Sequence, residues 1–206
     1  MARIELWNGD ICDLEVDAIV SPASTSLWMS NGTAGELKRA GGDAIEFAAV
    51  RQAPRELGDA IVTEAGRLAA KVVIHAVSLE RDRRTSAAAI DRAARSAMAR
   101  VRELGLQSVA FPALGTGIGG FPLDEAARIA VQAVRDELHT PSTVEHVIFA
   151  LRGAAAYEAF AAALSAGEPA PVRPLVASTG ALDAADRPQD PPPPAPEGRG
   201  TAEGPA

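Results

Sequence analysis

The sequence predicts an α/β protein, a three-layer α/β/α sandwich built around a mixed, mostly parallel sheet of six strands. Two observations predict this class. Six short apolar runs rich in β-branched residues alternate with longer segments that have helical spacing, and this alternation is typical of a sheet covered by helices on both faces. Two of the runs, 72–77 and 144–151, are apolar almost without interruption, as in strands that are buried on both sides.

The six predicted strands, in chain order, are 4–7, 18–20, 60–63, 72–77, 108–111 and 144–151. The predicted helices are 35–40, 44–51, 85–104, 123–138 and 154–164. Gly105 follows the third helix, as is typical of a residue that ends a helix in a left-handed conformation. Asp124 and Glu125 begin the fourth helix, where negative charge suits the helix dipole.

The prolines divide the chain into a folded part and a tail. Ten of the 15 prolines lie in residues 168–206. That segment carries too little apolar surface to offset the entropy lost on ordering. We therefore expect one folded domain at 1–167 and a disordered, acidic tail at 168–206, whose partner, if it has one, the sequence does not identify.

Composition excludes several classes of function. The net charge of −7 argues against a general nucleic-acid binder, which carries a basic surface. Cys12 is the single cysteine and the histidines lack ligand-like spacing, so we expect no disulfide within the chain and no metal site. No apolar run reaches the ~20 residues of a membrane span, and the first residues do not resemble a secretory signal. We expect a cytoplasmic protein that does not contact membranes.

Two loops carry the functional signal. Segment 21–35 follows a predicted strand and leads into a helix. Segment 113–122 does the same and places four glycines between 115 and 120. Glycine allows a loop to turn its backbone N–H groups toward an anion, and a helix N-terminus adds a favourable dipole. Because ligands of open α/β sheets bind at the carboxyl ends of the strands, the two loops predict a diphosphate site.

The same glycines leave an alternative open. Residues 115–120 match the G-x-G-x-x-G pattern of dinucleotide-binding proteins, which would indicate a nicotinamide-dependent oxidoreductase. That motif normally follows the first strand and is followed about 20 residues later by an acid that closes a strand. Here the loop comes late, and Asp136 and Glu137 lie inside a predicted helix. A tight turn without a ligand is the other alternative.

Several motifs together resemble the macro domain, the module that binds ADP-ribose. The resemblance covers about residues 2–165 and rests on motifs that agree in order and spacing: Asn8-Gly-Asp-Ile11, Val16-Asp-Ala-Ile-Val20, Gly32-Thr-Ala-Gly35, Gly66 with Val73-Ile-His75, and Ser108-Val-Ala-Phe-Pro-Ala-Leu-Gly-Thr-Gly-Ile118. It implies ADP-ribose, or a macromolecule modified with it, as the ligand, and no cofactor.

The resemblance also implies roles for individual residues. Asp10 would accept a hydrogen bond from the adenine amine, a task that suits a carboxylate because it only accepts. Segments 31–33 and 115–118 would form the two phosphate loops. The full implied ligand set is Asp10, Ile11, Val20, Ala23, Ser24, Asn31, Gly32, Thr33, Gly115, Thr116, Gly117, Ile118, Gly119 and Arg152.

Several positions depart from the pattern of the family. Ser24 replaces an asparagine that usually holds the distal ribose, and Ala34 replaces the aspartate of the mono-ADP-ribosyl hydrolase branch. Gly119 stands where an aromatic residue often covers the distal ribose. Arg152 stands where an aromatic residue commonly stacks on adenine, and a guanidinium can also stack on a ring.

The implied reaction is hydrolysis of an ADP-ribosyl linkage by water attack at the distal ribose. With Ala34 in place of the acid, the candidates for catalysis are Glu36, Ser24 and Asn31. Loss of a general base lowers the rate by ~10²–10⁴. The sequence therefore leaves two hypotheses open: a weak or substrate-restricted hydrolase, and a module that binds ADP-ribose without turnover.

Overall fold

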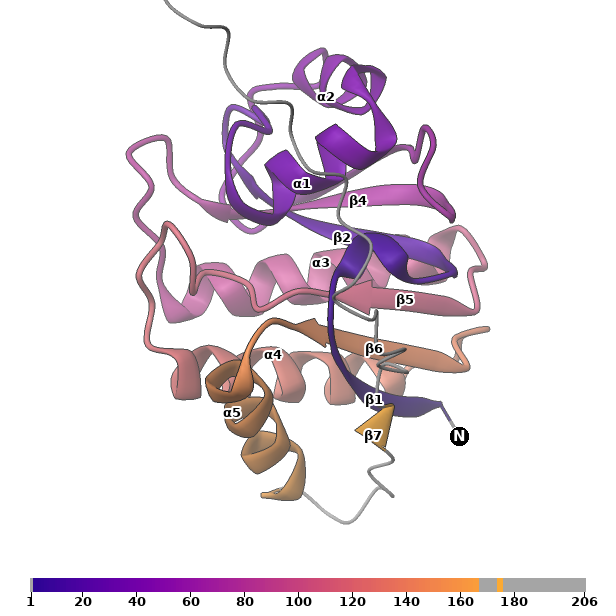
Figure 1. The fold of residues 1–206 in the computed structure, drawn as a ribbon, viewed down its shortest axis with the longest axis vertical. Helices are drawn as coiled ribbons and strands as arrows, with labels where there is room; N and C mark the ends of the chain where they lie inside the picture. Colours follow the sequence, from indigo (N-terminus) through magenta and orange to yellow (C-terminus); the bar gives the residue numbers. More distant parts are fainter. Residues whose placement is uncertain (1, 167–173, 176–206) are drawn as a thin grey trace, which may run out of the picture.

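The protein folds around a central sheet that runs through the whole domain (Figure 1). The computed structural model describes residues 2–166 and 174–175. Its sheet has seven strands in the order β3-β4-β2-β5-β6-β1-β7. The strands are β1 (Arg3–Asn8), β2 (Val16–Ser24), β3 (Ala60–Glu64), β4 (Ala70–Leu79), β5 (Ser108–Phe111), β6 (His146–Leu151) and the two-residue β7 (Pro174–Leu175). The first six confirm the predicted mixed sheet, and the predicted tail, 168–206, lies outside the described residues apart from β7.

Strand direction fixes where the loops converge. Every pairing is parallel except β3 with β4, so the carboxyl ends of β1, β6, β5, β2 and β4 share one edge. The strand predicted at 18–20 is longer than expected, since β2 pairs with β4 as far as Ser24 and shows an irregularity at Ala23 and Ser24. Segment 21–24 is therefore strand, and the first loop begins at Thr25.

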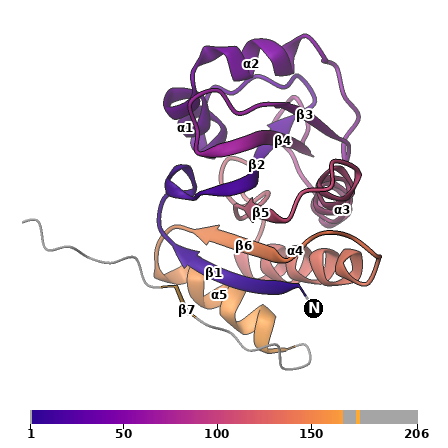
Figure 2. The ribbon, with the colours of Figure 1, turned by 90° about the vertical axis from the view of Figure 1, so that its right-hand side faces the viewer.

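Helices cover both faces of the sheet. The sequence forms η1 (Ile11–Asp13), α1 (Gly32–Gly41), α2 (Asp43–Val50), α3 (Ala87–Glu103), α4 (Leu123–Leu138) and α5 (Ala154–Ser165). Alternating residues of β2 point to opposite faces, so Val20 belongs to the core cluster that contains residues of α3, α4 and α5, whereas Ile19 belongs to the cluster that contains residues of η1 and α1. Figure 2 shows α1 and α3 on opposite sides of the sheet. The predicted three layers are confirmed.

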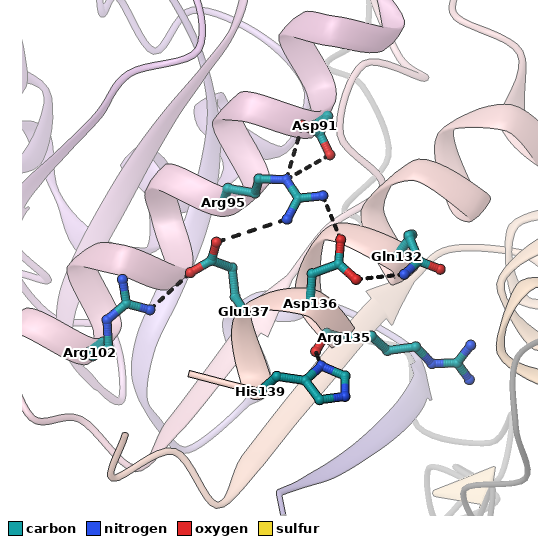
Figure 3. A network of polar contacts seen from close by, with 8 residues as sticks. All are labelled: Asp91, Arg95, Arg102, Gln132, Arg135, Asp136, Glu137 and His139. Atoms are coloured by element: carbon teal, nitrogen blue, oxygen red, sulfur yellow. Dashed lines mark hydrogen bonds and ion pairs between the residues drawn. The ribbon is translucent and has the colours of Figure 1, made fainter. Parts of the chain in front are cut away.

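The outer surface of α3 and α4 is joined by ion pairs (Figure 3). Arg95 of α3 contacts Asp91, and its Nη2 lies 2.7 Å from Asp136 Oδ2 on α4. Arg102 Nη1 lies 2.9 Å from Glu137 Oε2. The Arg95 hydrogen bond lowers the pKa of Asp136. The two acids that a dinucleotide site would use thus join helices, away from the glycine loop.

The helices of the described part do not include one that is both long and apolar enough to cross a membrane.

Candidate ligand-binding cleft

A cleft of about 250 Å³ lies at the shared carboxyl edge of the parallel strands. It contains residues from the ends of β1, β6, β5, β2 and β4 and from the helices that follow. Its lining residues are Gly9, Ile11, Pro22, Asn31, Gly32, Thr33, Ala34, Glu36, Leu79, Pro112, Ala113, Gly115, Thr116, Gly117, Ile118, Gly119, Ala150, Leu151, Arg152 and Ala156. The two loops singled out in the sequence therefore face one space, as predicted.

The glycine loop after β5 is shaped by close packing. Gly115 has φ +79°, and a Cβ there would lie 2.6 Å from Ile90 Cδ1. A Cβ on Gly119 would lie 2.7 Å from the Gly115 carbonyl oxygen. That same carbonyl accepts a hydrogen bond of 3.1 Å from Phe121 N. The loop thus requires glycine at 115 and 119 because its own backbone and Ile90 approach so closely.

The second wall of the cleft is the N-terminus of α1. Gly32, Thr33 and Ala34 line the cleft in the first turn of this helix. The N–H groups of a first helical turn have no partner further back in the helix, and Asn31 does not cap them with its side chain. Such a helix end attracts anions through these N–H groups and the helix dipole. This arrangement can hold a phosphate without a lysine.

The segment leading into α1 is held by a buried carboxylate that the sequence analysis did not identify. Glu46 of α2 is buried, and its Oε2 accepts a hydrogen bond of 2.7 Å from Met29 N. Its Oε1 lies 2.6 Å from Lys38 Nζ on α1, and this hydrogen bond raises the pKa of Lys38. Glu46 therefore fixes α2, α1 and the loop relative to one another. A buried acid in an apolar helix was the signal that could have found it.

One end of the cleft is closed by an arginine between two carboxylates. Arg152 Nη2 lies 2.6 Å from Asp10 Oδ2, and Arg152 Nη1 lies 2.5 Å from Glu36 Oε1. The other oxygen of Asp10 caps η1 by accepting a hydrogen bond of 2.9 Å from Cys12 N. Burial acts to raise the pKa of Asp10, but the hydrogen bonds from Cys12 and Arg152 outweigh it and the pKa is lowered. Asp10 is therefore an ionised acceptor at the rim.

Most of the expected ligand residues line the cleft, and four do not. Asp10 lies at the rim, in contact with the lining residue Arg152. Val20 is wholly buried in the core beneath, and Ala23 packs in a separate cluster with Leu27. Ser24 ends β2, and its Oγ lies 3.0 Å from Ser26 Oγ.

Several lining residues that share a position in the fold were not predicted from the sequence. All stand at or just beyond a strand end or on the face of a nearby helix, where the parallel sheet exposes its carboxyl edge: Gly9, Pro22, Leu79, Pro112, Ala113, Ala150, Leu151 and Ala156. The sequence pattern predicts where strands end, but only the strand order shows which strand ends lie together.

Two other reactive side chains, His75 and Cys12, do not line the cleft. His75 is buried, its Nε2 lies 2.9 Å from Thr63 Oγ1, and burial lowers its pKa to about 4. Burial, followed by the hydrogen bond and charge of Asp10, raises the pKa of Cys12 to about 12. Groups of three or more His, Cys, Asp or Glu able to hold a metal ion do not occur among the residues that the structure describes.

Fold and cleft together define an α/β domain with a cleft at the carboxyl edge of its sheet, lined by a helix N-terminus and a glycine loop. Residues 20–130 match the family model described as Macro domain, and the chain belongs to this family. A Mycobacterium tuberculosis protein is 43% identical over 168 residues, which cover 82% of this chain and 46% of that relative. This chain therefore spans about half the length of that relative.

Two further comparisons concern proteins with named ligands or activities. The O-acetyl-ADP-ribose deacetylase of Salmonella gallinarum is 36% identical over 154 residues, which cover 72% of this chain and 86% of the enzyme. The crystal structure of a Trypanosoma brucei macrodomain in complex with ADP-ribose superposes with a TM-score of 0.73 at 26% identity, covering 80% of this chain and 69% of that one.

Proposed function

We propose that the cleft binds ADP-ribose, either free or attached to a macromolecule. One observation carries this proposal: the N-terminus of α1 and the glycine loop after β5 line a single cleft that has Asp10 at one end. The Trypanosoma brucei macrodomain, which shares the fold, was solved with ADP-ribose bound. This likeness supports the same ligand here.

Each part of the ligand has a counterpart in the cleft. The diphosphate fits the backbone around Gly32 and Gly115–Gly117, because helix-end and loop N–H groups bind anions without a basic side chain. The adenine amine fits Asp10, a carboxylate that can only accept. Arg152 lies beside Asp10, where its flat guanidinium offers a surface on which adenine can stack.

Calorimetry with ADP-ribose, AMP and NAD tests the proposal. We expect ADP-ribose to bind at least ten-fold more tightly than AMP, because AMP has a single phosphate and cannot engage both phosphate loops. Gly117→Glu should abolish binding: a Cβ at this position meets nothing within 4 Å, so the fold tolerates the side chain while its charge repels the diphosphate. Ala88→Glu adds the same charge at an exposed site on α3 and should bind like the wild type.

Asp10→Ala should weaken ADP-ribose binding by about ten-fold, the value of one hydrogen bond to a charged group. Equal and feeble binding of all three nucleotides, or tight binding by Gly117→Glu, would refute the proposal.

Slow hydrolysis of an ADP-ribosyl linkage is the second candidate function. The similarity to a protein named O-acetyl-ADP-ribose deacetylase supports it. Within the described cleft lining Glu36 is the single acid, and its carboxylate is paired with Arg152 at the Asp10 end. Asn31 lines the cleft near the start of α1, whereas Ser24 does not. Without a free general base we expect a rate ~10²–10⁴ below that of a fully equipped enzyme.

Single-turnover release of ADP-ribose from a modified protein separates hydrolase from reader. The Gly117→Glu variant serves as the blocked control. Release by the wild type above this control supports the hydrolase, and release equal to it supports a module that binds without turnover. Glu36→Gln distinguishes a catalytic carboxylate from one that only pairs with Arg152, because the amide keeps a hydrogen bond to the guanidinium.

A further inference from the structure

A second cavity lies outside the cleft, beside the carboxyl end of β4. Its volume is about 360 Å³. The loop after β2, the connection after α2 and the loop after β4 border it, and its lining residues include Thr25, Trp28, Val50, Pro54 and Arg81. The residues that line this cavity, named here the Trp28 cavity, do not line the cleft.

Hydrogen bonds hold the walls of the Trp28 cavity in place. Thr25 N donates a bond of 3.1 Å to the carbonyl of Leu79, at the end of β4. Met29 follows Trp28 in the chain, and its N–H donates the bond of 2.7 Å to Glu46 Oε2 on α2. The loop that carries Trp28 is therefore tied to both of the elements that border the cavity with it.

Trp28 presents an aromatic surface that the described part of the domain leaves uncovered. The residue is 58% exposed, whereas its neighbours Leu27 and Met29 are buried. These buried neighbours hold the indole at the surface, and Val50 and Pro54 extend the apolar lining around it. An exposed aromatic side chain on a fixed apolar wall is typical of a surface that binds another segment.

Arg81 adds a positive charge to the lining of the same cavity. Its side chain is exposed, and the carboxylate of its neighbour Asp82 lies 2.6 Å from Arg84 Nε instead. Within residues 2–166, no carboxylate forms an ion pair with Arg81. A fitting occupant therefore combines an apolar surface, which packs on the indole, with a carboxylate for Arg81.

The chain itself contains a segment with these two properties. Residues 190–197, named here the proline segment, read Asp-Pro-Pro-Pro-Pro-Ala-Pro-Glu and lie outside the described residues. Proline runs favour the polyproline II conformation, which aromatic-lined grooves bind at a low entropic cost because it is already extended. Asp190 and Glu197 place a carboxylate at either end of the run, and the segment contains no basic residue.

The length of chain between β7 and the proline segment is sufficient for it to reach the cavity. Because β7 pairs in parallel with β1, its carboxyl end faces the same edge of the sheet as the end of β4. Five strand spacings separate β7 from β4 (Figure 1), which amounts to about 24 Å. The 14 residues 176–189 span up to about 46 Å when extended.

We propose that the Trp28 cavity is the docking site of the proline segment of the same chain. The prolines pack on the Trp28 indole, and a flanking carboxylate pairs with Arg81. A linker of this length gives the segment an effective concentration of about 1 mM, so an intrinsic Kd of about 0.1 mM docks it in about nine molecules of ten. The inference concerns a surface apart from the cleft and does not depend on the ligand bound there.

A nitroxide label in the proline segment tests the proposal on the full chain. Cys12 is the single cysteine, so Cys12→Ser combined with Ala195→Cys directs the label to one position. Electron paramagnetic resonance then measures the fraction of label that tumbles fast, and we expect about a tenth. Trp28 is one of two tryptophans, so the NMR spectrum contains two indole N–H signals, and the label should broaden that of Trp28 more strongly than that of Trp7.

Matched variants assign the docking to the cavity. Trp28→Ala and Arg81→Glu should each weaken docking about ten-fold, which raises the fast-tumbling fraction from about a tenth to about half. Phe47→Ala removes another exposed aromatic side chain, on α2, that does not line the cavity, and should leave the fraction unchanged. Arg81→Glu combined with Asp190→Lys and Glu197→Lys restores opposite charges and should return the fraction to about a tenth.

Three results would overturn the proposal. The first is a label that tumbles as fast in the otherwise unchanged chain as in the Trp28→Ala protein. The second is a charge reversal at Asp190 and Glu197 that fails to restore docking to the Arg81→Glu protein. The third comes from mixing ¹⁵N-labelled chain without nitroxide with nitroxide-labelled chain without ¹⁵N: broadening of the Trp28 signal there would show that the segment of a second copy fills the cavity.

Discussion

Replacement of Glu46 by alanine should destabilise the domain through the segment before α1. The Glu46 side chain is buried on α2, and its Oε2 lies 2.7 Å from the backbone nitrogen of Met29, which is itself buried. Alanine removes the acceptor and leaves that N–H without its partner in a place that water does not reach. The substitution also frees the loop that carries Asn31 into the cleft.

The size of the effect follows from this single hydrogen bond. A buried hydrogen bond to a charged group contributes about 1.5–3 kcal/mol, and an orphaned partner costs a similar amount. We therefore expect Glu46→Ala to lower the free energy of unfolding by about 2–3 kcal/mol. For a domain of this length, each kcal/mol lowers Tm by about 2–4 °C. Glu46→Gln keeps an acceptor oxygen and should lose about half as much free energy.

Urea unfolding and thermal melts measure the change. Glu64→Ala removes an exposed carboxylate from the end of β3 and should change the free energy by less than about 0.5 kcal/mol. The affinity for ADP-ribose should fall in Glu46→Ala as well, because the first turn of α1 is less well placed. Equal stability of the Glu46→Ala and Glu64→Ala proteins would refute the reasoning, as would a Glu46→Gln variant as unstable as the alanine one.

Three further predictions concern a buried histidine, a partly buried cysteine and two glycines with positive φ. Burial lowers the pKa of His75 to about 4, whereas an unfolded histidine titrates near 6.5. Below pH 6.5 the unfolded chain therefore takes up a proton that the folded protein does not. Acidification from pH 7.5 to 5 should lower the free energy of unfolding by about 2 kcal/mol, and His75→Gln should not show this loss. Burial and Asp10 raise the pKa of Cys12 to about 12, so iodoacetamide at pH 8 should react about 10³-fold more slowly than with a free cysteine, and Asp10→Asn should speed the reaction. Gly66→Ala should lower the free energy of unfolding by more than about 2 kcal/mol, because φ is +61° and the new Cβ would clash with a backbone carbonyl of α1. Gly105→Ala should lower it by only about 1–2 kcal/mol, because φ is +63° but the space around the new Cβ is open.

Each of these has a result that contradicts it. An imidazole resonance of His75 that titrates near pH 6.5 in the folded protein would exclude a buried neutral ring. A Cys12 thiol that reacts as fast as glutathione would exclude the environment described around Asp10. Equal melting temperatures for the Gly66→Ala and Gly105→Ala proteins would show that φ strain alone, without the steric contact, sets the cost.

Local features carried much of the prediction. The strands at 72–77 and 144–151 were predictable because a strand buried on both faces must be apolar along its length, and this property is visible within a few residues. The glycine loop was also predictable, because a loop with a closely packed backbone needs glycine, and its glycines lie within a few residues of one another. The end of β2 was not, because pairing with β4 as far as Ser24 depends on a distant strand.

The sequence by itself determined an α/β domain with two loops suited to phosphate, because periodicity and glycine content act over short stretches of chain. Only the tertiary structure decided what closes the cleft and what lies beside it. Arg152 meets Asp10 across 142 residues of sequence, and Thr25 and Arg81 line one cavity although two helices and two strands separate them in the chain. Such meetings depend on strand order, which is fixed by the packing of the whole core and not by any local segment.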